Sequence, residues 1–403
     1  MAIKNSIHDL AIFGGTPLFS SAKSTSNLLR PDFGRFMEYS HLFLQAGRYV
    51  GNGPAVELLE QRLAKFHDAS HCITVCSGFW GLALAIAALA IPDRTEIIMP
   101  SLTYRRMPDV ASWTGLKPRF CEVDPDTLAV TSATVSACLT DQTALILAPH
   151  PIVNQCDIVG LTDLARSHRL PLLFDAVESV YESTPSGKVG SHGNAEVFSI
   201  HACKLINGFG GGYITTNDDQ LAATLRVLRN RGLTDEGQQV RCDGLNAHLN
   251  EMHAAMALAS LDDVDQQVAR NRERYRAYQT GLAGLPGLRL LAFDEDHATG
   301  FKNIVVELQE QWPLSRQLTI QLLNMEKILA RAYYWPALHR KEMHFAHVPA
   351  TLPVTDFLAE RYLNLPCGHL VTTGDIDRIV QLLAFIHAHA DEILRNMQPG
   401  GLA

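Results

Sequence analysis

No cluster of lysine and arginine residues stands out in this sequence, and the formal net charge is −8. Proteins that bind nucleic acids carry a basic patch that neutralises phosphates, so we expect neither DNA nor RNA as a partner. The eight cysteines form no C-x-x-C pair, and the seventeen histidines form no H-E-x-x-H or comparable set. The closest group, His387, His389 and Asp391, lies in an amphipathic helical pattern. We therefore predict no metal site and no disulfide scaffold.

Long apolar segments are also missing. The longest run, residues 78–91, is too short to span a bilayer and predicts a buried helix instead. The N-terminal segment MAIKNSIHDLAIFGG has no apolar core followed by a small-residue cleavage site. We expect no signal peptide, no membrane association and a cytoplasmic location in which the cysteines stay reduced.

What the chain does contain is an alternation of apolar strand-like segments and helical segments. The strand-like segments are residues 71–78, 96–104, 117–124, 144–150, 171–179, 195–202 and 211–218. Helical periodicity connects several of them, which predicts an α/β fold with a mostly parallel seven-stranded sheet covered on both faces. A helix-rich region and a Gly/Pro stretch follow. We predict a large domain over residues 1–284 and a smaller α/β domain over residues 285–403.

The stretch FSIHACKLINGFGGG places a single lysine, Lys204, between a strand-like run and the glycines 208, 210, 211 and 212. An exposed charge is the ordinary explanation for a loop lysine. Glycines, however, let a backbone pass close to a bulky group or adopt positive φ. Lysine is also the amine that forms Schiff bases with carbonyl compounds. The combination favours a lysine that binds an aldehyde cofactor.

Two further strand ends carry suitable side chains for pyridoxal phosphate (PLP). Asp175 closes the strand LLFD and could protonate the pyridine nitrogen, while Ser77 and Gly78 open a helix whose N-terminus could hold the phosphate. Singly, these residues are explained as a turn residue and a helix cap. Together with Lys204 they favour a PLP site at the carboxyl ends of the strands.

With these residues in place, the chain resembles the DegT/DnrJ/EryC1/StrS family of PLP-dependent sugar aminotransferases, which has fold type I. The family's lysine motif reads approximately F-S-[FL]-H-[AP]-[TC]-K-x-x-[NT]-x-x-E-G-G, against FSIHACKLINGFGGG here. The similarity continues in register through NGPAVELLEQRLAKF, PSLTY, CEVDPDTLAV, FDA, GLNAHLNEMHAAMALASLDDVD, YYWPALH and LAERYLNLPCGHLVTTGDIDRIVQLL. It covers nearly the whole chain.

This resemblance implies roles for individual residues. Lys204 would form the Schiff base and move the proton between substrate and cofactor carbons, and Asp175 would pair with the pyridine nitrogen. Ser77, Gly78 and Ser199 would contact the phosphate. Tyr104 would stack on the ring, and Asn246 would reach across a homodimer interface to the phosphate of the partner subunit.

The chain departs from the family pattern around the cofactor. Phe79 replaces the threonine of the phosphate turn, and Glu178 stands where the family has Gln or His near the phenolic oxygen. A carboxylate beside a phenolate is repulsive unless one group is protonated or a cation intervenes. Gly210 replaces a glutamate, and the other changes are Ile152, Val153 and His248.

Three hypotheses remain at this stage. The first is aminotransfer from an amino acid, such as glutamate or glutamine, to a keto-sugar or a related natural-product intermediate. The second keeps PLP but uses it for elimination, replacement or carbon–carbon bond formation on an amino acid. The third is a protein of this fold that has become a binding or regulatory module. The loops 20–50, 104–108 and 233–243 are expected to select the acceptor.

Overall fold

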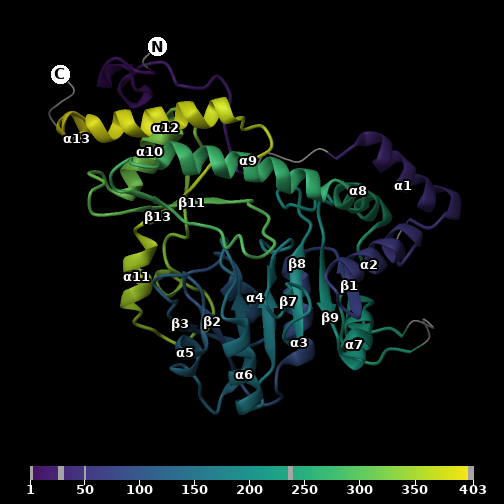
Figure 1. Ribbon diagram of the computed structural model, residues 1–403. Helices are drawn as coiled ribbons and strands as arrows, with labels where there is room; N and C mark the ends of the chain where they lie inside the picture. The colour runs from purple at the N-terminus through teal and green to yellow at the C-terminus, as the bar shows by residue number, and fades with distance from the viewer. Residues whose placement is uncertain (1–2, 26–30, 50, 235–238, 398–403) are drawn as a thin grey trace.

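The computed structural model of the protein describes residues 3–25, 31–49, 51–234 and 239–397. Parts of the loops expected to select the acceptor, residues 26–30, 50 and 235–238, lie outside the described residues. Two sheets dominate the molecule, a large one in its lower half and a small one above it (Figure 1).

The large sheet has seven strands in the order β1-β9-β8-β5-β4-β2-β3. Their bounds are β1 His71–Val75, β2 Glu96–Pro100, β3 Lys117–Cys121, β4 Thr143–Pro149, β5 Leu172–Asp175, β8 Ala195–Ser199 and β9 Gly212–Thr216. The pairs among β3, β2, β4, β5 and β8 are parallel, whereas β9 runs antiparallel to both β8 and β1. The predicted mostly parallel sheet is therefore confirmed.

Helices cover both faces of this sheet, which explains why its strands are almost continuously apolar. Along β2, Ile97 and Met99 belong to one buried cluster and Ile98 to another, because successive side chains point to opposite faces. The helices up to α8 are α1 Phe33–Ala46, α2 Pro54–Phe66, α3 Gly78–Leu89, α4 Met107–Trp113, α5 Ser132–Ser136, α6 Ile158–His168, α7 Asp219–Arg229 and α8 Glu251–Asp262. The apolar run predicted as a buried helix is α3.

The small sheet is antiparallel, with the order β10-β11-β13-β12. Its strands are β10 Leu288–Leu290, β11 Ile304–Leu308, β12 Arg331–Ala332 and β13 Tyr362–Leu365. The accompanying helices are α9 Val264–Leu282, α10 Arg316–Met325, α11 Pro353–Ala359, α12 Thr373–Ala388 and α13 Ala390–Met397. A short hairpin, β6 Ser183–Thr184 and β7 Gly187–Lys188, completes the strands of the described residues. The domain boundary after residue 284 stays a prediction; it falls between α9 and β10.

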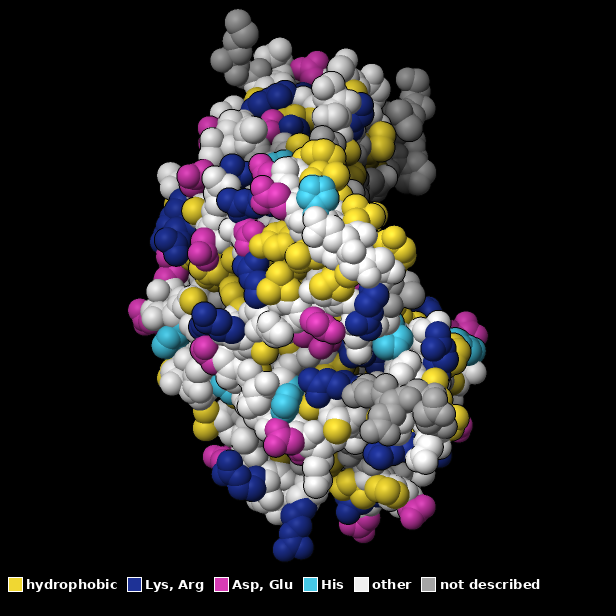
Figure 2. Space-filling view, turned by 90° about the vertical axis from the view of Figure 1, so that its right-hand side faces the viewer, with side chains coloured by type: hydrophobic (Ala, Val, Ile, Leu, Met, Phe, Trp, Pro, Cys, Tyr) yellow, Lys and Arg dark blue, Asp and Glu magenta, His cyan; other side chains and the backbone are white. Residues whose placement is uncertain are grey.

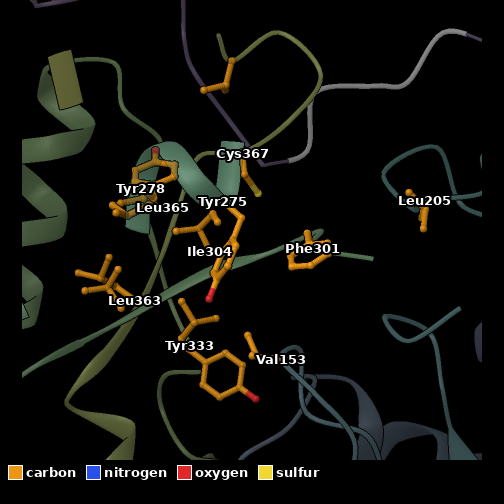
Figure 3. Close-up of a cluster of buried hydrophobic side chains, with 14 of the residues drawn as sticks. Val153, Leu205, Tyr275, Tyr278, Phe301, Ile304, Tyr333, Leu363, Leu365 and Cys367 are labelled. Carbon is orange, nitrogen blue, oxygen red and sulfur yellow. The ribbon is translucent and has the colours of Figure 1, made fainter. Parts of the chain in front are cut away.

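One buried cluster connects the two sheets (Figure 3). Val153 and Leu205 lie in loops that follow strands of the large sheet, and they share this cluster with Ile304 and Leu363 of the small sheet. Leu205, the neighbour of Lys204, thus belongs to the same buried cluster as side chains of the small sheet. This packing lets residues distant in sequence approach Lys204.

The N-terminal segment lies beside the C-terminal half of the chain (Figure 1). The Glu326 carboxylate accepts hydrogen bonds from the backbone N–H groups of Ala11 at 2.7 Å and Leu18 at 2.6 Å, and it pairs with the Lys4 ammonium at 3.0 Å. Among the described residues, no helix is both long and apolar enough to cross a membrane.

Candidate active site

The predicted site residues gather at one edge of the large sheet. β9 is antiparallel to both β1 and β8, so β1 and β8 run in the same direction. The strands from β8 to β3 are parallel to one another, so β1 also shares their direction. Their carboxyl ends lie at one edge, where parallel sheets bind ligands. Ser77 follows β1, Tyr104 follows β2, Asp175 ends β5 and Ser199 ends β8.

A compact cradle forms where β1, β8 and β9 meet the start of α3. The Ser77 hydroxyl accepts a hydrogen bond from the Trp80 N–H at 3.2 Å and so caps α3. A Cβ atom on Gly78 would lie 3.1 Å from Cβ of Ser199, and one on Gly212 would lie 2.6 Å from N of Gly78. Only glycine fits at position 212, and position 78 leaves little room for a side chain. The first N–H groups of α3 have no acceptor within the helix, so the cradle suits an anion such as phosphate.

Asp175 is 4% exposed, and its Oδ1 accepts a hydrogen bond from the Val177 N–H at 3.1 Å. Burial raises the pKa of the Asp175 carboxyl to about 6, against the opposing effects of the Val177 N–H and the Lys204 ammonium. A buried carboxylate gains from a cationic partner, because pairing compensates for lost hydration. Asp175 is thus suited to hold a protonated ring nitrogen.

The Glu178 carboxylate lies between two lysines. Its Oε1 accepts a hydrogen bond from the Lys204 ammonium, and its Oε2 lies 2.8 Å from Nζ of Lys302. Burial disfavours ionisation of Glu178, but the two ammonium groups outweigh burial and hold the pKa of this carboxyl well below its ordinary value. Burial also disfavours the charged form of Lys204, which lowers its pKa. The nearby Glu178 carboxylate outweighs burial, so the pKa of Lys204 is raised. The departure at Glu178 is therefore accompanied by a second cation, Lys302, next to the carboxylate.

The loop that carries Lys204 is a tight turn held by its own backbone. The Lys204 N–H donates to the carbonyl of His201 at 2.8 Å, and the Gly208 N–H donates to the carbonyl of Ile200 at 2.8 Å. A Cβ atom on Gly208 would lie 2.7 Å from Cδ1 of Ile200, and Gly211 adopts a φ of 123°. These two glycines are thus explained by packing and backbone conformation within the loop. A bulky ligand passing close to the backbone, which we expected from the sequence, is not needed to explain Gly208 and Gly211.

Packing accounts for one departure from the family pattern, Phe79, but not for Gly210. The Phe79 ring packs edge-to-face on Trp80 at 5.3 Å, and Trp80 packs in the same way on Trp113 at 5.2 Å. At Gly210, a Cβ atom would lie 3.6 Å from Cε1 of His253, an ordinary contact distance. The structure therefore leaves room for a side chain at position 210.

Two predicted residues do not contact the Lys204 cluster. Asn246 is exposed and forms a backbone bridge with Asn230. Its neighbour Ala247 accepts a hydrogen bond from the Cys76 N–H at 2.8 Å, so Asn246 lies near the end of β1. Tyr104, which follows β2, is 46% exposed.

Sequence reasoning missed two side chains near the cluster, Lys302 and Tyr334. Burial raises the pKa of the Tyr334 phenol well above its ordinary value, and the charges of Glu178 and Asp175 add to this effect. Tyr334 belongs to the segment YYWPALH, which was matched to the family without a role. Lys302 lies 124 positions after Glu178, and no pattern in the sequence marks it.

Comparison with known proteins identifies the family and the fold. Residues 34–384 match the model of the DegT/DnrJ/EryC1/StrS aminotransferase family. The structure of DesI, solved in the presence of its TDP-sugar product, is 34% identical with a TM-score of 0.91, covering 97% of this chain and 99% of DesI. DesV of S. venezuelae, solved in complex with a ketimine intermediate, is 27% identical with a TM-score of 0.80, covering 88% of this chain and 94% of DesV.

A more distant structure shares the fold alone. PseC of Helicobacter pylori, an aminotransferase involved in the biosynthesis of pseudoaminic acid, is 20% identical with a TM-score of 0.80, covering 92% of this chain and 99% of PseC. The match of the family model over most of the chain, together with the similarity to DesI, confirms the resemblance inferred from the sequence. The chain belongs to the DegT/DnrJ/EryC1/StrS aminotransferase family.

Proposed function

We propose that this aminotransferase binds PLP at the carboxyl edge of the large sheet. The observation that carries the proposal is the buried Asp175 carboxyl beside the amine of Lys204, which supplies both an acid for the ring nitrogen and a nucleophile for the aldehyde. Ser77, Gly78 and Ser199 form an anion cradle next to them. When bound, PLP supplies an electron sink that stabilises negative charge on the carbon next to the transferred nitrogen.

The residues around this position would then act in distinct ways. Lys204 would hold the cofactor covalently and, once released, carry a proton between two neighbouring carbon atoms. Asp175 would keep the ring nitrogen protonated. Tyr104 and Phe79 would line the pocket, with Tyr104 stacking on the ring, and Glu178 would lie near the phenolic oxygen. These roles follow from the family motifs.

The acceptor that we propose is a keto-sugar, carried as a nucleotide-linked derivative or a related natural-product intermediate. The support is the similarity to DesI, whose structure was solved with a TDP-sugar product. An amino acid such as glutamate would be the donor. Elimination, replacement or carbon–carbon bond formation on an amino acid is the second candidate. It is favoured by Glu178 and by the missing acidic side chain at Gly210.

A half-reaction tests aminotransfer directly. The PLP-loaded protein, mixed with L-glutamate and no acceptor, should release stoichiometric 2-oxoglutarate and then stop, because the amino group stays on the enzyme. Keto acid is measured by a coupled dehydrogenase assay, with D-glutamate as the control. Release of ammonia and a keto acid over many turnovers, from an amino acid with a leaving group on its β-carbon such as O-acetyl-L-serine and with no acceptor present, would favour elimination. If no amino acid yields its keto acid, aminotransfer is wrong.

We also propose that the protein is a homodimer with shared active sites. Exposed hydrophobic side chains occur on α1, on α8 and in the turn after Lys204: Phe33, Met37, Leu44, Phe209 and Met252. α1 contacts α8, and Phe36 of α1 contacts Phe209 at 6.1 Å, so these elements form one face. Figure 2 shows hydrophobic side chains at the surface on this side of the molecule. A second copy of the chain would cover them and bring Asn246 to the phosphate of the partner subunit.

Charged substitutions in this face should therefore weaken the dimer. We expect light scattering after gel filtration to give twice the chain mass for the wild type, and Met37→Asp and Met252→Asp to shift the protein toward the monomer, since a dimer would bury these carboxylates. Val159→Asp, at an exposed position on α6, is the matched control. A monomeric wild type would refute the proposal, as would variants that dimerise like the control.

A cytoplasmic location and the domain boundary after residue 284 are further parts of the proposal. All eight cysteines are free in the structure, which agrees with a reducing compartment.

A further inference from the structure

The arrangement of Lys204, Glu178 and Lys302 is not explained by the roles assigned so far. The Glu178 carboxylate pairs with two ammonium groups, that of Lys204 at Oε1 and that of Lys302 at Oε2. The three side chains are covered, with relative exposures of 15% for Lys204, 18% for Glu178 and 16% for Lys302. At this depth the electrostatic interaction is screened less than at the surface.

Lys302 reaches the site from the other sheet. It lies two residues before β11, and its neighbour Asn303 places Nδ2 3.5 Å from the same oxygen of Glu178. The Cys367 thiol donates a hydrogen bond to the Lys302 carbonyl at 2.7 Å and so holds the backbone at this position. Lys302 is thus positioned by the small sheet, while Lys204 and Glu178 belong to the large one.

Other charged and titratable groups around Lys204 also influence how easily it loses a proton. Asp175 approaches it from the end of β5, Glu178 from the loop that follows β5, and Cys203 from its own loop. A pocket lined by Lys204 and Lys302 also contains Arg274, Cys367 and His369. Because this pocket opens to solvent, a proton can leave the Lys204 ammonium to water.

A lysine must lose one proton before its nitrogen can attack a carbonyl carbon. If Glu178 had Lys204 as its only cation, it would hold Lys204 as ammonium and would keep an uncompensated charge once Lys204 became neutral. With Lys302 on the second oxygen, the carboxylate retains a partner when the proton leaves. The positive charge of Lys302 also disfavours a second cation nearby.

We propose that Lys302 is a positioning residue that shares the Glu178 carboxylate with Lys204, so that Lys204 can become a neutral nucleophile while Glu178 stays ionised beside the bound cofactor. The proposal rests on the proposed role of Lys204 in binding PLP. In this role Lys302 compensates the charge of the Glu178 carboxylate both before and after the Lys204 amine reacts.

The reactivity of Lys204 in the full-length, cofactor-free protein tests this proposal. Trace acetylation with acetic anhydride across a pH series, read by mass spectrometry of the Lys204 peptide, gives the midpoint at which the amine becomes neutral. Lys302→Met should raise this midpoint by about one pH unit, since it removes a nearby cation and leaves Glu178 to Lys204 alone. Lys302→Gln, which keeps a hydrogen-bond donor but no charge, should raise it as well. Lys302→Arg should leave it near the wild-type value.

Two comparisons separate this effect from a disturbed structure. Glu178→Gln should lower the midpoint, because Lys204 then loses its anion, so the two substitutions shift it in opposite directions. Lys117→Met, at an exposed position that begins β3 at the opposite edge of the sheet, should leave it unchanged. Circular dichroism establishes that each variant is folded.

An unchanged or lowered midpoint in folded Lys302→Met and Lys302→Gln would overturn the proposal. The proposed function fails in a distinguishable way, since it requires that borohydride reduction of the PLP-loaded wild type leave a cofactor-derived mass on the Lys204 peptide. The acetylation series reads the amine without cofactor and does not depend on that result.

Discussion

Replacing Lys204 by alanine should reduce the rate of aminotransfer by about 1,000-fold or more, because the variant loses both the amine that holds the cofactor and the group that moves the proton. The protein itself should still fold. Glu178 keeps Lys302 as a partner at 2.8 Å, so the substitution does not leave this carboxylate without a cation. The initial rate of 2-oxoglutarate release from L-glutamate measures the loss, and mass spectrometry after borohydride reduction should find no cofactor on the protein.

Lys204→Arg provides the sharper comparison for this prediction. Arginine keeps a cation beside Glu178 but cannot act as a neutral amine near physiological pH. We expect Lys204→Arg to fold like the wild type and to be as inactive as Lys204→Ala, whereas Lys117→Ala, which changes an exposed lysine at the far edge of the sheet, should keep full activity. Aminotransfer at the wild-type rate in either Lys204 variant would refute the assignment of this residue, and intact cellular function without Lys204 would favour a binding module.

Much of the fold could be predicted because local pattern and tertiary environment agree. The strand β4, Thr143–Pro149, is apolar along its whole length since it is buried on both faces, and the sequence ALILAPH carries that signal directly. Asp175 could be predicted for a related reason. It is a carboxylate that directly follows an apolar strand, and strand ends of parallel sheets are where ligands bind.

The ion cluster could not be predicted, because it depends on how the two sheets pack. Glu178 was expected to repel the phenolic oxygen unless a cation intervened, and the structure supplies Lys302 from 124 positions further along the chain. Nothing in the local sequence around Lys302 distinguishes it from an exposed lysine near a strand. The position of Lys302 follows instead from the buried cluster in which Leu205 and Ile304 both take part.

The glycines after Lys204 illustrate a different limit. Their number correctly indicated a crowded place, yet the crowding at Gly208 comes from the side chain of Ile200 within the same loop. Gly212 does lie against the cradle, because a Cβ atom at this position would be 2.6 Å from N of Gly78. A glycine signals that space is short, but the sequence does not say whether the neighbour is protein or ligand.

Replacing Asp175 by asparagine should lower the rate of aminotransfer by about 100-fold to 10,000-fold. The amide can keep the hydrogen bond from the Val177 N–H, but it carries no negative charge that would hold a proton on the ring nitrogen, so the electron sink is weakened. Asp175→Glu, which restores the charge at a shifted position, should recover part of the activity. An Asp175→Asn variant as active as the wild type would exclude this role for the carboxylate.

The same substitution should stabilise the cofactor-free protein at neutral pH. The pKa of Asp175 is raised from 3.8 when unfolded to about 6 when folded, so the folded state disfavours its ionised form. The wild type therefore loses stability as the pH rises from about 4 to about 6, up to about 3 kcal/mol, and the loss persists above that range. Asp175→Asn avoids this loss.

The melting temperature of Asp175→Asn should exceed that of the wild type at pH 8 and approach it below pH 4, in thermal unfolding followed by circular dichroism. Bound PLP should reverse the order at pH 8, since the ring nitrogen then pairs with the carboxylate. A cofactor-free variant that is less stable than the wild type at pH 8 would show that the buried charge at position 175 is already compensated by Lys204.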